Sequence, residues 1–299
     1  MRPCFACLVL LLCLLGQSNL LGQANLLGQA KQTSRVEIEK EIEFANVDGI
    51  SLRLDLHLPE EVKGAAVIVY IHGGGWQNGS KSSCPIRWLT EGGFVVASIS
   101  YRLTHQAIFP AQIHDCKAAV RWLRANADRY GYQTERIGVA GSSAGGMLAA
   151  LMATSGDVEV LEGDVGGTLE FSSRVQAAVD YYGATDFVLR SVTQPSRANK
   201  PGSVVFKLLG GPADEKIDAA KLASAVTHIS PDDPPLMVLH GRKDQTVLPD
   251  QTERIIERYN QAGLSITAVF EKEAGHGGNV FYQGMNREFV TAFFKRHLN

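Results

Sequence analysis

The sequence predicts an α/β protein: a doubly wound, mostly parallel sheet of about eight strands with helices on both faces. Two observations lead to this prediction. Apolar and polar residues alternate over residues 50–58, as in a strand with one solvated face, and the later apolar runs are continuous, as in parallel strands covered on both faces. Helical stretches separate these runs, which is the alternation that builds a parallel sheet.

The first two strands are expected to form an antiparallel hairpin at one edge of the sheet. The stretch from Ile50 to Leu58 alternates strictly, and the stretch from Val36 to Phe44 is its expected partner. The continuous apolar runs predict six further strands, at residues 65–71, 94–101, 136–141, 175–182, 235–240 and 265–270. Helices are predicted at residues 112–129, 144–154, 251–261 and 279–297.

Residues 187–233 interrupt this alternation of strands and helices. They include Pro195, Pro201, Pro212 and a Gly-Gly pair at 210–211, with short apolar patches between them. We interpret this stretch as a small lid-like insertion over the carboxyl ends of the strands, not as a second domain. The expected organisation is a leader over residues 1–30, followed by one α/β domain over residues 31–299.

The N-terminus has the features of a secretory signal. Arg2 precedes an apolar run from Cys4 to Leu15, which is too short to span a bilayer but matches the apolar region of a signal peptide. Three copies of a six-residue unit follow, each ending in Gly-Gln-Ser or Gly-Gln-Ala, and these small residues suit a cleavage point. We therefore expect a secreted or periplasmic protein. A buried N-terminal helix and a lipoprotein anchor at Cys13 are the alternatives.

Composition excludes some classes of partner. The chain has 299 residues and a formal net charge of −2, without a long block of like charges, so no basic surface for nucleic acid or for a membrane is expected. No cluster of His and Cys has metal-ligand spacing, so neither a metal nor a cofactor is expected. Cys84 and Cys116 lie outside the leader. We interpret them as buried thiols, with a disulfide between them as the alternative.

The segment Gly141-Ser-Ser-Ala-Gly145 places one serine between glycines, directly after a predicted strand and before a predicted helix. A strand that turns sharply into a helix at such a serine strains the serine backbone and exposes its Oγ, with the amides of the helix N-terminus beneath. Ser143 is therefore the candidate nucleophile. A phosphate-binding loop is the alternative, but the lysine of a P-loop and the spacing of a dinucleotide motif are both missing.

A glycine-rich loop, His72-Gly-Gly-Gly-Trp76, follows the third predicted strand. Glycines let backbone N–H groups turn toward a substrate carbonyl, so the N–H groups of Gly74, Gly75 and Ala144 are the expected donors to a developing oxyanion. Trp76 is expected to bind substrate through its ring, and His72 is expected to orient the loop. A loop that only turns a corner is the alternative.

An activated serine needs a base, and an acid that orients the base. Asp244 follows the predicted strand at 235–240 and is the candidate acid, whereas its competitor Asp250 has the position of a helix start. His276 lies in a glycine loop after the last predicted strand and is the candidate base. The other histidines considered for this role are His105, His228 and His240.

The chain order of these three residues is that of the α/β-hydrolases, and from Leu52 onward the sequence resembles that superfamily. More narrowly, it resembles the hormone-sensitive-lipase-like and the feruloyl and acetyl-xylan esterase-like carboxylesterases. The matching stretches are HGGGW at 72–76, SYRL at 100–103, GSSAGG at 141–146, HGRKD at 240–244 and the loop around His276. The lipase-like branch usually carries a helical N-terminal cap, for which the residues before His72 leave little room.

The resemblance implies a serine carboxylesterase with an α/β-hydrolase fold and a Ser-His-Asp triad. Its implied partner is a small-molecule or carbohydrate-linked ester, such as the acetyl or feruloyl groups of plant polysaccharides. Without a cap, we expect an open cleft with aromatic surface from Trp76 and from Tyr101 or Phe109, which favours short-chain or aromatic acyl groups. An amide-cleaving relative (an arylformamidase or a serine peptidase) and a non-catalytic binding module are the alternatives.

Overall fold

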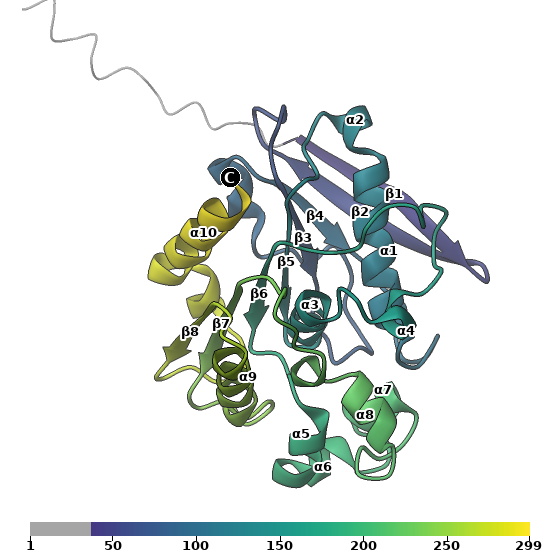
Figure 1. Ribbon diagram of the computed structural model, residues 1–299, viewed down its shortest axis with the longest axis vertical. Coiled ribbons are helices and arrows are strands. Elements are labelled where there is room, and N and C mark those ends of the chain that lie inside the picture. The colour runs from purple at the N-terminus through teal and green to yellow at the C-terminus, as the bar shows by residue number, and fades with distance from the viewer. Residues whose placement is uncertain (1–36) are drawn as a thin grey trace, which may run out of the picture. The chain divides into compact units, whose positions relative to one another are not determined.

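The computed structural model describes residues 37–299, which contain one sheet of eight strands (Figure 1). The strands are β1 (Glu37–Val47), β2 (Ile50–Leu58), β3 (Val67–Ile71), β4 (Val95–Ile99), β5 (Ile137–Ser142), β6 (Ala177–Tyr181), β7 (Leu236–Gly241) and β8 (Ile266–Glu271). Their order across the sheet is β1-β2-β4-β3-β5-β6-β7-β8. β2 is antiparallel to β1 and to β4, and all other neighbours are parallel. The predicted eight-stranded sheet with its edge hairpin is confirmed.

Burial along the strands follows the predicted patterns, with two exceptions. In β2, Leu52 and Leu54 are buried and Ser51 and Arg53 are partly exposed, as predicted, but Asp55 and His57 are buried as well, so the expectation of a solvated face is wrong for the second half of this strand. Every residue of β3, β4, β5, β6 and β7 is buried, as expected for strands covered on both faces. None of the residues of β8 is buried, so the expectation of cover on both faces is wrong for this strand. The reason is that β8 lies at the edge of the sheet.

The helices lie mostly where the sequence predicts them. Their bounds are η1 (Arg87–Gly92), α1 (Ala111–Ala125), α2 (Ala127–Tyr130), α3 (Ala144–Thr154), α4 (Glu159–Glu162), α5 (Phe187–Thr193), α6 (Pro195–Ala198), α7 (Val204–Leu209), α8 (Ile217–Leu222), η2 (Ala225–Thr227), α9 (Asp250–Gln261), η3 (Asn279–Tyr282) and α10 (Gly284–Leu298), where η denotes a 3₁₀ helix. Two predicted helices are interrupted. The first divides at Asn126 into α1 and α2, and the last divides at Gln283, which is extended, into η3 and α10.

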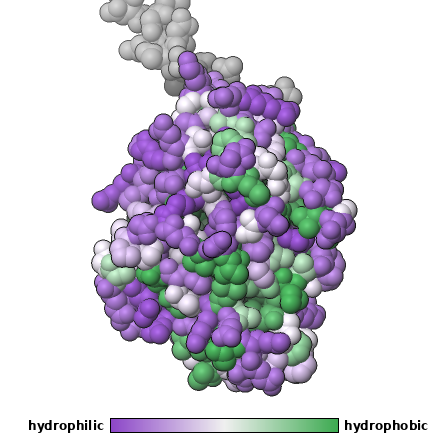
Figure 2. Space-filling model, turned by 45° about the vertical axis from the view of Figure 1, so that its right-hand side comes forward, coloured by the Kyte–Doolittle hydropathy of each residue, from purple (hydrophilic) through white to green (hydrophobic). Residues whose placement is uncertain are grey.

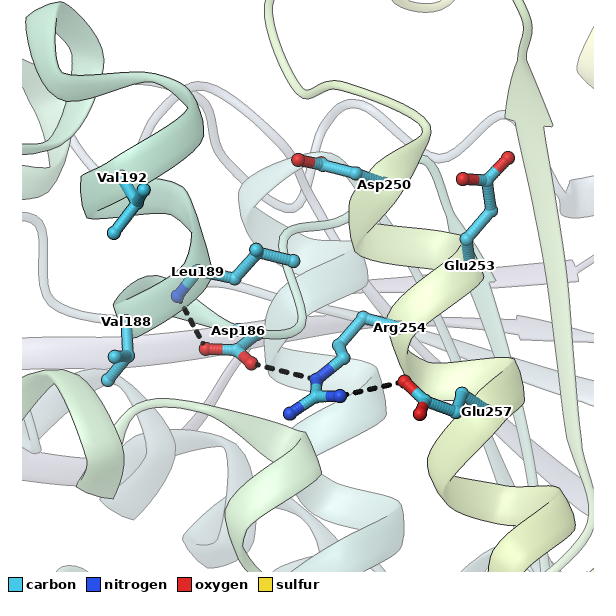
Figure 3. A pocket seen from close by; sticks show the side chains of 8 residues that line it. All are labelled: Asp186, Val188, Leu189, Val192, Asp250, Glu253, Arg254 and Glu257. Carbon is cyan, nitrogen blue, oxygen red and sulfur yellow. Dashed lines mark hydrogen bonds and ion pairs between the residues drawn. The ribbon is translucent and has the colours of Figure 1, made fainter.

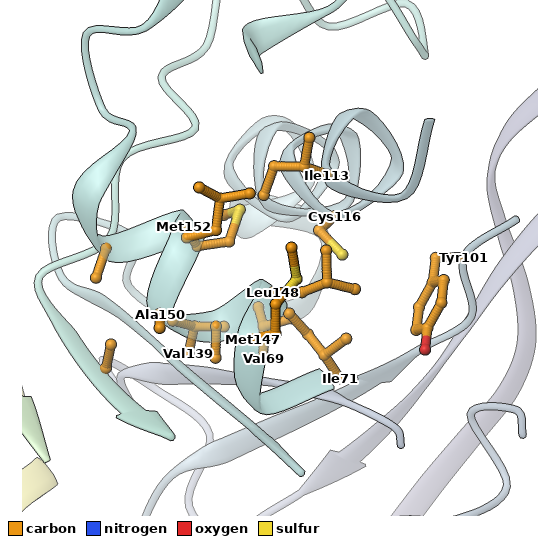
Figure 4. Packing of buried hydrophobic residues seen from close by; sticks show 14 of the residues in the cluster. Val69, Ile71, Tyr101, Ile113, Cys116, Val139, Met147, Leu148, Ala150 and Met152 are labelled. Atoms are coloured by element: carbon orange, nitrogen blue, oxygen red, sulfur yellow. The ribbon is translucent and has the colours of Figure 1, made fainter. Parts of the chain in front are cut away.

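Two apolar clusters cover the two faces of the sheet. Val69 and Ile71 of β3 join one cluster with side chains of α1 and α3, which Figure 4 shows, while Tyr70 joins the other with side chains of η1 and α10. Cys116 belongs to the first cluster and Cys84 to the second, so the sheet separates them. Both are buried free thiols, and the alternative of a disulfide between them is excluded.

The insertion between β6 and β7 holds the short helices α5, α6, α7, α8 and η2. These helices lie beyond the carboxyl ends of the parallel strands, at the lower side of Figure 1. The predicted leader over residues 1–30 lies outside the described residues. Within residues 37–299, no helix has both the length and the apolar character needed to cross a membrane.

Candidate active site

Ser143 lies in a sharp turn between β5 and α3. Its backbone has φ 54° and ψ −111°, a conformation rarely adopted by residues other than glycine, so the strained turn predicted at this serine is confirmed. The N–H of Ser143 donates to the carbonyl of Tyr181 (2.8 Å), and the carbonyl of Ser143 accepts from the N–H of Met147 (2.9 Å). These bonds to β6 and α3 hold the turn in place.

The glycines around this turn are required by its close packing. A Cβ atom on Gly141 would lie 2.0 Å from the carbonyl oxygen of Gly145, and one on Gly145 would lie 2.0 Å from that of Ile71. A Cβ atom on Gly146 would lie 2.2 Å from Oδ1 of Asp180. The strand and the helix therefore approach this closely only because these positions carry no side chain.

The structure brings the three predicted triad residues together. Oγ of Ser143 lies 2.7 Å from Nε2 of His276, and Nδ1 of His276 lies 2.6 Å from Oδ2 of Asp244. Asp244 follows β7 and is fully buried, whereas His276 follows β8 and keeps 20% of its side chain exposed. The competitor Asp250 instead begins α9, as its position in the sequence indicated.

The surroundings of Asp244 keep its carboxylate ionised. Its Oδ1 accepts hydrogen bonds from the N–H groups of Thr246 (2.8 Å) and Val247 (3.0 Å). Burial by itself raises the pKa of Asp244, but hydrogen bonds from His240 and His276 outweigh burial and hold the pKa well below its ordinary value. An ionised carboxylate only accepts hydrogen bonds, so Nδ1 of His276 carries a proton and Nε2 is free to take one from Ser143.

His240 contacts the candidate acid and not the candidate nucleophile. Its Nε2 lies 3.2 Å from Oδ2 of Asp244 and 3.0 Å from the carbonyl of Val247, and its Nδ1 lies 2.6 Å from Oγ1 of Thr252. The ring is fully buried. Sequence reasoning considered this histidine only as an alternative base. Its place at the end of β7, four residues before Asp244, was the signal for the observed contact.

His72 orients the glycine loop, as predicted. Its ring stacks on that of Tyr101 with centroids 4.4 Å apart, and its Nδ1 lies 2.7 Å from the carbonyl of Gly73. The hydroxyl of Tyr101 donates to the carbonyl of His72 (3.1 Å). A Cβ atom on Gly73 would lie 3.5 Å from Cβ of Ser143, so Gly73, which sequence reasoning passed over, lies beside the turn.

The backbone N–H groups expected to form the oxyanion hole donate no hydrogen bond within the described residues. Among residues 37–299, the N–H groups of Gly74, Gly75 and Ala144 have no acceptor on the protein, and neither has that of Gly73. Gly74 and Gly75 have φ angles of 119° and 60°, in the region that favours glycine. Of these four N–H groups, those of Gly73 and Ala144 belong to residues that lie beside Ser143 or follow it directly.

Trp76 does not supply exposed aromatic surface. Its ring is 3% exposed and lies against that of Phe187 in α5, with centroids 5.9 Å apart. Tyr101 and Phe109 are buried as well. The expectation of an open cleft lined by these three aromatic rings is therefore wrong, and this burial does not support direct binding of substrate by the Trp76 ring. The physical reason is that helices of the insertion cover the glycine loop and bury its large apolar side chain.

A group of tyrosines that sequence reasoning missed lies behind the turn. The hydroxyl of Tyr70 lies 2.9 Å from Oγ of Ser142, and the hydroxyls of Tyr182 and Tyr282 lie 2.7 Å apart. The ring of Tyr182 meets that of His276 edge to face, with centroids 5.0 Å apart. These tyrosines come from distant parts of the chain, so no local pattern signalled the group.

Comparisons with known proteins identify a family and several similar esterases. A profile of the BD-FAE family matches residues 54–259, which are 206 of the 299 residues. The probable carboxylic ester hydrolase LipM of Mycobacterium tuberculosis is 34% identical over 201 residues, covering 66% of this chain and 45% of LipM. Esterase LipC of the same organism is 31% identical over 219 residues, covering 72% of this chain and 53% of LipC. The chain thus spans about half the length of these two relatives.

Solved structures match over most of the described chain. A truncated carbohydrate esterase from gut microbiota superposes with a TM-score of 0.79 and 28% identity, covering 89% of this chain and 98% of its own. The Thermogutta terrifontis esterase Est2, with propionate bound, has a TM-score of 0.70 and 25% identity, covering 87% and 94%. Both matches confirm the α/β-hydrolase fold. Because the family profile covers more than half of the sequence, the chain belongs to the BD-FAE family.

Proposed function

We propose that the protein is a serine carboxylesterase with Ser143 as nucleophile, His276 as base and Asp244 as acid. One observation carries the proposal: hydrogen bonds of 2.6 Å and 2.7 Å link Asp244 through His276 to Ser143, at a turn whose strained backbone presents the serine. The similarity to named esterases supports the same reaction class.

In the proposed first step, Oγ of Ser143 attacks the ester carbonyl carbon while Nε2 of His276 takes the hydroxyl proton. Asp244 stabilises the imidazolium that forms, and keeps the ring in the required tautomer. The imidazolium then protonates the leaving alcohol, which leaves an acyl group on Ser143. In the second step His276 takes a proton from water, which attacks the acyl carbon, and Ser143 recovers its proton as the acid departs.

When Ser143 attacks, the carbonyl oxygen of the ester becomes an oxyanion, which needs hydrogen-bond donors directed at it. We propose that the N–H groups of Gly74, Gly75 and Ala144 supply them, together with that of Gly73, which lies beside Ser143. Preorganised N–H groups of this kind contribute several kcal/mol to transition-state stability, because they need no reorganisation when the charge forms. The first turn of α3 adds its positive dipole end beneath the same atoms.

The proposed substrates are short-chain or aromatic acyl esters, with acetyl or feruloyl groups of plant polysaccharides as the natural class. The similarity to a carbohydrate esterase, and to an esterase solved with propionate, supports this choice. The insertion also approaches the glycine loop closely. A Cβ atom on Gly75 would lie 3.1 Å from Cγ1 of Val204, and Nζ of Lys207 donates to Oε1 of Gln77 (2.7 Å). We expect this cover to limit the room for a long acyl chain.

Replacement of the nucleophile tests the proposal. Ser143→Ala should lower turnover of p-nitrophenyl acetate by ~10³-fold or more, because little catalysis remains once the nucleophile is gone. Its thermal unfolding should match that of the wild type. A fluorophosphonate probe should label Ser143 in the wild type, and the Ser142→Ala control should keep the label, because Oγ of Ser142 bonds to Tyr70. Labelling at Ser142, or an active Ser143→Ala variant, would contradict the assignment.

A substrate comparison separates the proposed esterase from its two alternatives. An amide-cleaving relative would turn over formamides or peptides faster than matched esters. A binding module would turn over neither and would not react with the fluorophosphonate. We expect hydrolysis of esters to exceed that of matched amides.

A further inference from the structure

Helix α5, the first helix of the insertion, lies between the two loops that build the candidate site. On one side its Phe187 packs against Trp76 of the glycine loop. On the other side, its next turn and the residue after it contact the loop that follows Asp244, which we call the acid loop (residues 244–248). Helix α5 therefore contacts both the glycine loop and the acid loop.

Arg190 of α5 makes the first contact with the acid loop. Its Nη2 donates to the carbonyl of Thr246 (2.7 Å), and the N–H of the same Thr246 donates to Oδ1 of Asp244 (2.8 Å). Arg190 is 2% exposed, and its Nε has no hydrogen-bond partner among residues 37–299. Burial lowers the pKa of Arg190 to about 10, so the guanidinium remains charged at neutral pH. A buried cation thus holds one peptide group of the acid loop.

Gln194, which follows α5, makes a second and independent contact with the same loop. Its Nε2 donates to the carbonyl of Gln245 (3.2 Å), and its Oε1 accepts from the N–H of Leu248 (3.4 Å). The side chain is buried. With Arg190, it engages three of the four loop residues that follow Asp244.

Helix α5 is itself fixed to α9, so it is a firm support for the acid loop. Oε1 of the buried Gln251 accepts from the N–H groups of Thr185 (3.1 Å) and Asp186 (2.9 Å) at the start of α5. Figure 3 shows Asp186 as the N-cap of α5, accepting from the N–H of Leu189 (2.9 Å) and pairing with Arg254 of α9 (3.4 Å). The start of α5 is therefore bonded to α9, while its later residues are bonded to the acid loop that leads into α9.

We propose that Arg190 and Gln194 are positioning residues of the esterase: they hold the acid loop so that the carboxylate of Asp244 stays aligned with His276. This inference rests on the proposed function, because it assigns Asp244 the role of the acid. It gives the insertion a second role besides covering the glycine loop. The two side chains act through the loop peptides and do not touch the substrate.

Arg190→Met tests the first contact, with Arg197→Met as the matched control. Arg197 lies in α6 and is exposed, and its positive charge lies near that of Arg190 without bonding to the acid loop. Arg190→Met should lower kcat by ~10- to 100-fold with little change in KM, because a small misplacement of a catalytic group costs rate rather than binding. Arg190→Lys, which keeps the charge and a donor, should restore part of kcat. Arg197→Met should match the wild type.

A spectroscopic reading tests positioning without any substrate. The proton shared by Nδ1 of His276 and Oδ2 of Asp244 should give a far-downfield proton NMR resonance, as expected for a short charge-assisted hydrogen bond. In Arg190→Met this resonance should weaken or shift upfield, while the spectrum of Arg197→Met stays unchanged. Gln194→Leu removes the second contact with the acid loop and should have the same effect on the resonance. If Arg190→Met does not fold, Gln194→Leu alone tests the positioning role.

The outcomes separate this inference from the proposed function. Folded Arg190→Met and Gln194→Leu variants with the kcat and the downfield resonance of the wild type would overturn the positioning role, and leave the esterase assignment intact. A kcat loss equal in Arg190→Met and Arg197→Met would also overturn it, since that loss would reflect charge and not the bond to Thr246. A wild-type protein without ester turnover would contradict the proposed function, and the NMR comparison would still test the loop contacts.

Discussion

Oδ2 of Asp244 lies 2.6 Å from Nδ1 of His276, and this contact leaves Nε2 as the imidazole nitrogen that faces Oγ of Ser143, 2.7 Å away. The other carboxylate oxygen is occupied by two backbone N–H groups of the acid loop. Oδ2 also lies 3.2 Å from Nε2 of His240, so each oxygen of the buried carboxylate has two partners, which fix its orientation.

Asp244→Asn should lower kcat strongly. An amide that keeps the two loop N–H bonds at its oxygen presents a donor to Nδ1 of His276, and this favours the wrong tautomer, at a cost of ~10³- to 10⁴-fold. We expect a smaller loss than in His276→Ala. Steady-state kinetics of the two variants check this, with Asp250→Asn as the control. A larger loss in Asp250→Asn would mean that the acid is misassigned.

Asp180→Asn should change how stability depends on pH. Burial raises the pKa of Asp180 to about 7, although the N–H of Gly183 donates to its Oδ1 (2.7 Å). Because the folded-state pKa lies above the unfolded value, the native state binds the proton more tightly, and this group costs stability as pH rises through the folded pKa. The free energy of unfolding of Asp180→Asn should gain about 2–3 kcal/mol relative to the wild type between pH 5 and pH 8.

Urea unfolding of both proteins at these two pH values measures the change. The asparagine keeps an acceptor for Gly183, so the pH-dependent part of the difference isolates the charge. Parallel stability curves for the two proteins would show that Asp180 is ionised in the native state at pH 5 as it is in the unfolded chain.

His57 should make the fold sensitive to acid. Its ring is buried in β2, and neither ring nitrogen has a hydrogen-bond partner within residues 37–299. Burial lowers the pKa of His57 to about 4, with a further contribution from Arg87. The stability that depends on the neutral ring is present above pH 6.5 and is lost as pH falls toward 4. From pH 7.5 to pH 5 this loss is about 2 kcal/mol.

His57→Leu removes the titrating group and should lose correspondingly less stability over the same interval. Denaturant titrations at pH 7.5 and pH 5 measure the two losses. Equal losses in the variant and the wild type would place the acid sensitivity elsewhere in the protein.

Acyl-chain preference should follow from the cover over the glycine loop. Each methylene left unburied forgoes ~0.8 kcal/mol of transfer free energy, so a site in which this cover limits the room for the acyl chain gains nothing from a long tail. We expect kcat/KM to be highest for acyl chains of about two to four carbons or for aromatic acyl groups. A panel from acetyl to dodecanoyl and feruloyl esters checks this. A steady rise to about twelve carbons would indicate a lipase whose insertion forms a closed apolar lid.

Removal of the N-terminal leader is a separate prediction. The sequence places small residues before each of three cleavage points, and we expect the exported protein to begin after Ala24 or Ala30. Mass spectrometry of protein recovered from the periplasm or the medium checks the new N-terminus. A protein that stays inside the cell with Met1 intact would remove the export proposal.

The elements and residues that form the proposed triad were determined by the sequence itself. The bounds of α3 agree with the prediction because its signals, a glycine-rich turn and the apolar run after it, are contiguous in the chain. Ser143, Asp244 and His276 each follow a strand of one parallel sheet. Because the carboxyl ends of such strands meet at one edge, their positions along the chain were enough to bring them together.

Contacts between distant segments were decided by the tertiary structure. Trp76 is buried because Phe187 of the insertion covers it, and Arg190 and Gln194 reach an acid loop more than fifty residues further along the chain. Periodicity reports which face of an element is apolar, but not which other element covers that face. The pairing of the insertion with the two loops therefore depends on packing in three dimensions, which no local pattern encodes.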